Sequence, residues 1–173
     1  MNSNSVSAVQ VLVTAYKDAL HLADANGDMP LHSACCNKTQ TAEEIVQAVL
    51  DAAPDVAQVA GQYGRLSLHA TCMNISAASA VQVVVMAYKE ALHLADENGD
   101  KPLHLACRNK TQAAEEIVKA VLEAAPGIAQ TAGFHGRLPL HVACMNSNSV
   151  SAVQVLVTAY KEALHMVDAN GDM

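Results

Sequence analysis

Aromatic side chains are scarce in this sequence of 173 residues, which has no Trp, one Phe and four Tyr. Its 51% apolar content therefore comes mainly from Ala, Val and Leu, and this content is ample for a buried core. A disordered chain is excluded by the same content. Small apolar side chains suit helices that pack closely against one another.

Basic residues are also few, since 10 Lys and Arg stand against 17 Asp and Glu, for a formal net charge of −7. Phosphate binding needs clustered Lys and Arg, so no nucleic-acid partner is expected and a basic or polar partner is favoured. Unbroken apolar stretches such as Val83–Ala87 fall far short of the roughly 20 residues that cross a bilayer, so no membrane insertion is expected. The first residues carry neither a positive charge nor an apolar run, which predicts no secretory signal.

The sequence repeats itself, because residues 26–97 return as residues 98–169, an offset of 72. A weaker half-period lies within this unit, where a Leu-His-x-x-Cys motif recurs at His32, His69, His104 and His141. Such self-similarity is typical of repeat arrays. The predicted organisation is a single solenoid over residues 1–173, made of a partial repeat (1–24), four repeats (about 25–60, 61–96, 97–132 and 133–168) and a partial turn (169–173).

Each repeat predicts a pair of helices. Proline opens the first helix of three repeats, because its φ is already helical and it has no N–H to leave unsatisfied; these residues are Pro30, Pro102 and Pro139. The second helix is amphipathic in the first full repeat, with Glu43, Gln47 and Asp51 outside and an inner face of Ile45, Val46, Val49, Leu50 and Ala53. Thr41-Ala42-Glu43-Glu44 predicts a capping box at its start.

Tight turns join the helix pairs, and they are of two kinds. One kind is Asn-Gly, at residues 26–27, 98–99 and 170–171. The other is Gly-x-x-Gly, at residues 61–64 and 133–136. Both kinds suit turns with positive φ. We expect these turns to project from the helices, and we call them fingers.

Residues 96–107 read Asp-Glu-Asn-Gly-Asp-Lys-Pro-Leu-His-Leu-Ala-Cys and resemble the ankyrin motif, whose common form is Thr-Pro-Leu-His-x-Ala. The motif recurs in all four repeats with some replacements and looks like a Leu-Pro-Leu-His-x-Ala-Cys subtype, and the resemblance covers the whole chain. It implies an all-α ankyrin-repeat solenoid of helix-turn-helix units with β-turn fingers, whose role is to bind a protein partner. The family's Thr is replaced by Met29, Leu66, Lys101 and Leu138, and Ser67 replaces one Pro. Since that Thr shares a hydrogen-bond network with the motif's His, we expect a thinner network here.

Eight His and five Cys raise the question of a metal site. Helices of successive repeats stack roughly 8 to 10 Å apart, whereas zinc ligands lie about 2.0 to 2.3 Å from the ion, so the ladder of motif histidines cannot converge on one ion. The resemblance instead assigns these histidines to hydrogen bonds that brace the fingers, and Cys35, Cys72, Cys107 and Cys144 to buried positions. A second ladder, at His21, His93 and His165, is predicted to be solvated or packed on loops. No metal, no cofactor and no enzymatic activity are expected.

The cellular location has two readings. An odd number of cysteines spread over the repeats favours reduced thiols and a cytoplasmic protein. Three N-glycosylation sequons, at Asn37, Asn74 and Asn109, favour an extracellular protein if they are used. The other interpretation of these asparagines is structural, with each one ending a first helix in the left-handed conformation that Asn tolerates best after Gly.

The resemblance places the partner on the face formed by the fingers and the exposed side of the first helices. On this sequence that face holds Met29, Ser33, Gln62, Tyr63, Arg65, Lys101, Leu105, Arg108, Phe134, His135 and Arg137. Tyr63, Phe134, Arg108 and Arg137 are the strongest candidate anchors, because aromatic and Arg side chains dominate binding energy. Several of these positions differ between the two 72-residue copies, which fits partner recognition and free drift of exposed sites equally well.

Residues 1–29 return as residues 145–173 with three changes. Neither end carries the polar residues of a capping repeat, and Val11, Leu12 and Val13 lie in a helix that has no partner helix before it. An alternative function is therefore structural: chains stack head to tail into filaments, secreted and glycosylated if the sequons are used. In that case isolated chains associate through the N-terminal face.

Overall fold

The computed structural model describes residues 3–39, 41–74, 78–146 and 150–160. These ranges contain helices and turns and no strand. The first helices of the four repeats are α2 (Pro30–Cys35), α4 (Ser67–Asn74), α6 (Pro102–Arg108) and α8 (Pro139–Met145). The second helices are α3 (Ala42–Ala52), α5 (Ser79–Ala87), α7 (Ala114–Ala124) and α9 (Val150–Ala159), and α1 (Ser3–Ala15) is a second helix that precedes the first full pair.

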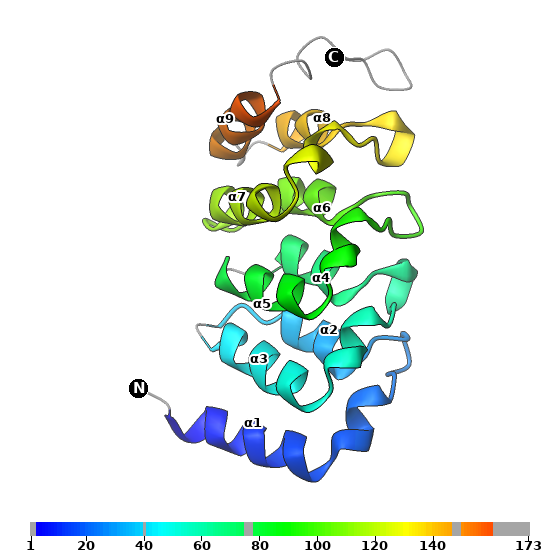
Figure 1. The fold of residues 1–173 in the computed structure, drawn as a ribbon, viewed down its shortest axis with the longest axis vertical. Coiled ribbons are helices and arrows are strands. Elements are labelled where there is room, and N and C mark those ends of the chain that lie inside the picture. Colours follow the sequence, from blue (N-terminus) through cyan, green and yellow to red (C-terminus); the bar gives the residue numbers. More distant parts are fainter. Residues whose placement is uncertain (1–2, 40, 75–77, 147–149, 161–173) are drawn as a thin grey trace.

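The helix pairs stack into a solenoid with two helical layers and a row of fingers along one side (Figure 1). Successive first helices contact one another from α2 to α8, and successive second helices do so from α1 to α9. Short 3-10 turns follow the second helices and return the chain to the next finger: η1 (Lys17–His21), η2 (Pro54–Gln58), η4 (Lys89–His93) and η5 (Pro126–Gln130). The predicted all-α solenoid is confirmed. None of the described helices is long and apolar enough to cross a membrane.

The first helices are short and lie between neighbours on both sides. Proline occupies the first helical position of α2, α6 and α8, as predicted. In α4 every residue from Ser67 to Cys72 is buried. A two-turn helix is too short to be stable alone, so its stability comes from this stacking.

The second helices bury one face and expose the other. In α3, Val46, Val49 and Leu50 are buried, as predicted, while Gln47 is exposed and its Nε2 donates a hydrogen bond to Oδ1 of Asp51 at 2.6 Å. The predicted capping box is wrong. Thr41 is the N-cap of α3, but its side chain makes no capping hydrogen bond, and its Oγ1 lies 3.0 Å from Oγ1 of Thr39 instead.

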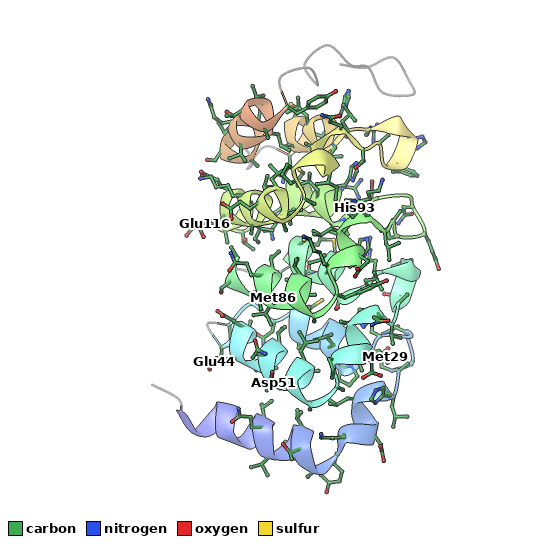
Figure 2. The ribbon with its side chains drawn as sticks, viewed as in Figure 1. Met29, Glu44, Asp51, Met86, His93 and Glu116 are labelled. Atoms are coloured by element: carbon green, nitrogen blue, oxygen red, sulfur yellow. The ribbon has the colours of Figure 1, made fainter. Side chains whose placement is uncertain are left out.

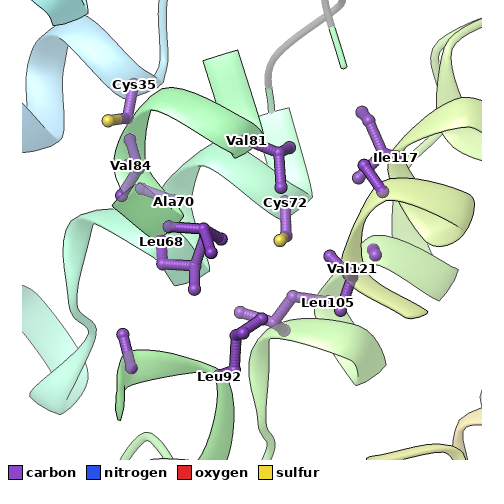
Figure 3. Close-up of a cluster of buried hydrophobic side chains, with 14 of the residues drawn as sticks. Cys35, Leu68, Ala70, Cys72, Val81, Val84, Leu92, Leu105, Ile117 and Val121 are labelled. Carbon is purple, nitrogen blue, oxygen red and sulfur yellow. The ribbon is translucent and has the colours of Figure 1, made fainter. Parts of the chain in front are cut away.

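The core runs along the whole stack between the two helical layers, and Figure 3 shows its central part. It is built of Leu, Val, Ile and Ala with Cys35, Cys72 and Cys107, all fully buried, at the same position of successive first helices. Burial raises the pKa of the Cys35 thiol to about 12, and it raises the pKa of Cys72 and Cys107 as well, so these thiols stay protonated. The prediction of a buried Cys144 is wrong, because no described first helix follows α8 to cover it.

The asparagines at the ends of the first helices join neighbouring repeats. The left-handed conformation predicted for the sequon asparagines is wrong for Asn109, which has φ −61°, and Asn146 at the end of α8 has φ −101°. Nδ2 of Asn109 donates to the carbonyl oxygen of Cys72 at 3.0 Å, and Nδ2 of Asn146 donates to that of Cys107 at 3.0 Å. Carbonyl groups that have no partner inside the preceding helix are satisfied in this way.

Candidate partner-binding face

Four fingers project beside the first helices: residues 24–29, 61–66, 96–101 and 133–138 form fingers 1 to 4. Fingers 1 and 3 are held by an Asp side chain. In finger 3, Oδ1 of Asp96 accepts hydrogen bonds from the N–H groups of Asn98 (2.9 Å) and Asp100 (3.1 Å). Asp24 does the same for Asn26 and Asp28 in finger 1. The glycine that follows the Asn in each has a positive φ, as the Asn-Gly motif predicts.

Fingers 2 and 4 are built differently, as tight turns with two successive positive φ angles. Tyr63 has φ 61° and ψ 28°, and Gly64 has φ 66°. His135 and Gly136 repeat this arrangement in finger 4. A residue other than Gly or Asn in the left-handed region costs about 1 to 2 kcal/mol. Tyr63 is 53% exposed in this conformation, at the tip of its finger. The sequence predicts the turn from its Gly-x-x-Gly motif, but it does not predict the left-handed conformation of Tyr63.

The motif histidines brace the fingers, as the resemblance implies. Nδ1 of His32 accepts a hydrogen bond from the N–H of Met29 at 3.1 Å, and its Nε2 donates to the carbonyl oxygen of Arg65 in the next finger at 2.9 Å. His104 makes the same pair of bonds with Lys101 and Arg137, at 3.2 and 3.0 Å. The N–H bound by Nδ1 belongs to the residue that replaces the family's Thr, so the bracing does not need that Thr. Each bracing histidine must be neutral to accept at one nitrogen and donate at the other.

A carboxylate forms a second bridge between fingers. Oδ1 of Asp28 accepts a hydrogen bond from the N–H of Gln62 at 2.8 Å, and Oδ1 of Asp100 accepts one from the N–H of Phe134 at 3.0 Å. The glycine before each donor is needed because the backbone comes so close. A Cβ at Gly133 would lie 2.6 Å from Oδ1 of Asp100 and 2.7 Å from Nε2 of His104.

Arg65 ties finger 2 to finger 3. Its Nε donates to Oδ2 of Asp96 at 3.2 Å, and its guanidinium carbon lies 5.3 Å from the ring centre of Tyr63, a cation–π distance. Burial by itself raises the pKa of Asp96, but hydrogen bonds from the N–H of Asp100, from Arg65 and from Asn98 outweigh it and hold that pKa below its ordinary value. The N–H of Glu97 also donates to the carbonyl oxygen of Tyr63 at 2.9 Å. The tip of finger 2 is therefore held by several bonds.

Most of the predicted partner-binding residues reach the surface. The exposed ones are Ser33, Gln62, Tyr63, Phe134 and His135, and the half-buried ones are Met29, Arg65, Lys101, Arg108 and Arg137. Figure 2 shows Met29 on the finger side, opposite Glu44, Asp51 and Glu116 on the second helices. The acidic surface of α3 and α7 thus lies away from the fingers.

The prediction for Leu105 is wrong, because this residue is fully buried. Figure 3 shows its side chain among those of the core. Leu105 lies in α6, which stacks on α4, and Ala70 and Val142 are buried at the same position of their helices. Ser33 occupies that position in α2 and is exposed, since no described first helix precedes α2. The position packs repeat on repeat and does not face a partner.

Arg108 ends α6 beside a buried carboxylate. Its Nη1 lies 2.6 Å from Oδ2 of Asp100, an ion pair whose geometry is not that of a hydrogen bond. A cavity of about 350 Å³ opens next to it, lined by Arg108, Lys110, Arg137, Val142, Met145 and Asn146. The sequence shows Lys110 only as the middle residue of a sequon, and no sequence signal places it in this cavity.

The sequon asparagines differ in accessibility. Asn37 and Asn74 are half-buried, whereas Asn109 is fully buried and its Nδ2 is the donor to Cys72. A glycan on Asn109 would require that hydrogen bond to break.

In the second histidine ladder, Nε2 of His21 lies 3.0 Å from Oδ2 of Asp55 on the surface, His93 is exposed, and His165 lies outside the described residues. Among the described residues, no group of three or more His, Cys, Asp or Glu could hold a metal ion.

The chain matches the model of a known protein family. The model for ankyrin repeats (three copies) matches residues 68–168, which is more than half of the chain. This span contains the helices α5 to α9 and fingers 3 and 4. No curated protein matches the sequence.

The close approach at Gly133 leads to a stability prediction. Gly133→Ala should lower the free energy of unfolding by about 2 kcal/mol or more, because the new Cβ displaces Asp100 and His104 from their hydrogen bonds. Gly127→Ala is the matched control: nothing lies within 4 Å of its Cβ position, so this variant should gain up to about 1 kcal/mol. Urea denaturation measures both values. Equal stabilities of the two variants would show that the bridge between fingers 3 and 4 is not formed.

The neutral histidines predict a loss of stability in acid. Burial lowers the pKa of His69 to about 4, and it also lowers the pKa of His104. Since the unfolded chain takes up protons first, the contribution of His69 is complete above pH 6.5 and is lost as the pH falls towards 4. This group alone should cost about 2 kcal/mol between pH 7 and pH 5.

Urea denaturation at the two pH values measures this loss. The loss should be smaller in His69→Gln, while the exposed-site variant His93→Gln should lose as much as the wild type. An unchanged loss in His69→Gln would contradict the assignment of the acid effect to this residue.

Proposed function

Since the chain belongs to the ankyrin-repeat family, whose members generally mediate protein–protein interaction, we propose that it binds its protein partner on the fingers and the exposed side of the first helices. One observation carries the choice of this face. Two aromatic side chains, Tyr63 and Phe134, are 53% and 40% exposed at the tips of fingers 2 and 4, on turns held rigid by hydrogen bonds. Rigid aromatic anchors lose little conformational entropy on binding.

The conformation of Tyr63 supports the same proposal. An aromatic residue held in the left-handed region costs stability without adding to the core. Strained residues persist where the surrounding structure holds them, and they cluster at functional sites. Here the hydrogen bond to the carbonyl oxygen of Tyr63 and the ring contact with Arg65 hold the side chain in place.

The test selects binders from a peptide library displayed on phage and measures their affinity for variants of the chain. The double variant Tyr63→Asn, Phe134→Gln should weaken binding about tenfold or more. The Gln at position 134 is the residue that finger 2 has at the equivalent position, Gln62. Stability should stay within about 1 kcal/mol of wild type, since Asn accepts the left-handed conformation. Met86→Gln is the control, because Met86 is 87% exposed on the second-helix side. Binding that is lost in Met86→Gln and kept in the finger variant would place the partner on the other side.

Self-association is a second candidate function, favoured by the surface of α1. An apolar patch lies on this surface, made of Val11 and Leu12 in α1 and Tyr16 just after it, which are 67%, 58% and 66% exposed. Exposed apolar patches of this kind mark protein contacts. We propose that a second copy covers this patch. Sedimentation velocity over a concentration series should show a mean mass that rises with concentration, and less so in Leu12→Glu. A wild-type chain that stays monomeric throughout would end this proposal.

A further inference from the structure

The cavity between α6 and α8 gathers positive charge. Three of its six lining residues are cationic, Arg108, Lys110 and Arg137, and among the described residues it has no acidic lining residue. The chain as a whole has only 10 basic residues. A larger cavity of about 760 Å³ between α7 and α9 has the opposite balance, with Glu115 and Glu123 around the single cation Lys119. The positive cavity therefore does not follow from the overall composition.

From this cavity we infer a subsite for a carboxylate side chain of an acidic peptide segment in the partner, an inference that rests on the proposed function. Arg108 is the main contact. A guanidinium has five N–H donors and can grip a carboxylate with two of them, and the ion pair with Asp100 leaves donors available. Asp100 is buried and holds the guanidinium at the cavity, so little freedom is lost on binding.

The other lining residues complete the match to a peptide. Lys110 is exposed and adds a second positive charge without a fixed direction. Met145 is 67% exposed and gives an apolar surface at the edge of the cavity, next to the buried Val142. The volume of about 350 Å³ lies at the lower end of the roughly 300 to 1,000 Å³ typical of ligand pockets. We therefore expect an Asp or Glu next to an apolar residue in the bound segment.

The equivalent place between α2 and α4 shows what makes the subsite. Cys36 stands there in the position of Arg108, and the cavity is about 150 Å³. Nδ2 of Asn74 donates to Sγ of Cys36 at 3.4 Å, so the cysteine is tied to the helix end. The lining of this cavity includes the acidic Asp28. An acidic segment should therefore bind between α6 and α8 and not between α2 and α4.

The experiment uses the full chain and a random dodecapeptide library displayed on phage. The expected result is enrichment of peptides that carry Asp or Glu beside an apolar residue. Arg108→Gln should weaken the selected peptide roughly 10- to 100-fold, and Lys110→Gln should weaken it several-fold. Lys119→Gln removes a positive charge on the second-helix side and should change nothing. Raising the salt concentration should weaken the wild type more than Arg108→Gln.

Circular dichroism establishes that each variant is folded. If Arg108→Gln unfolds because Asp100 is left buried without its cation, Lys110→Gln alone decides the matter, since Lys110 is exposed. Selected peptides that lack acidic residues, yet are lost in the Tyr63→Asn and Phe134→Gln variant, would overturn the carboxylate subsite and leave the proposed function standing. Acidic peptides that ignore both cationic substitutions would overturn it as well. A DNA dodecamer that displaces the peptide and depends on Arg108 would also overturn it, in favour of a phosphate site.

Discussion

The structure depends on polar groups of one repeat being satisfied by the next. A finger backbone that packs against its neighbour cannot leave a carbonyl or N–H group unpaired without a cost of about 1 to 3 kcal/mol. The histidine Nε2 and the Asp carboxylate supply these partners at one end of α2 and α6, as between His104 or Asp100 and finger 4. The Asn amide supplies them at the other end, as between Asn146 and Cys107. First helices of two turns are stable only within this stack. The glycines that begin fingers 2 and 4 are required because the side chains of the preceding repeat come so close to their backbone.

The residues that hold the repeats together differ from those of the proposed binding face. Residues that hold the repeats together are buried or point along the stack, such as Leu103 and His69. Tyr63 and Phe134, which we propose as partner contacts, are exposed and contribute nothing to the core. The same separation holds for charge. Acidic residues lie on the second helices α3 and α7, whereas Arg108, Lys110 and Arg137 gather between two first helices on the finger side.

Sequence alone predicts the features that depend on local chemistry. The proline at the first helical position and the Gly-based turns follow from the backbone conformation of a single residue. The amphipathic second helix follows from the helical period of its apolar residues. Apart from the capping box at Thr41, which is a local feature, the errors concern contacts between repeats. Leu105 looks like an exposed variable position until α4 is placed against it. Asn109 looks like a left-handed helix end until the carbonyl group of Cys72 is brought within 3.0 Å of its amide. Lys110 enters the cavity only because α8 and finger 4 lie beside the loop after α6.

The histidine bonds of α2 and α6 run the same way along the stack. The ring N–H belongs to the earlier repeat and the carbonyl oxygen to the later one, from His32 to Arg65 and from His104 to Arg137. At such a boundary the earlier repeat presents a ring N–H and a carboxylate, and the later repeat presents a finger carbonyl group and a finger N–H, as between finger 4 and the His104 and Asp100 side chains. The two sides match only when they meet in the order of the chain, because two like sides would set each donor against a donor and each acceptor against an acceptor. The array therefore has a chemical polarity. A repeat that joins it must have the right orientation along the stack as well as the right shape.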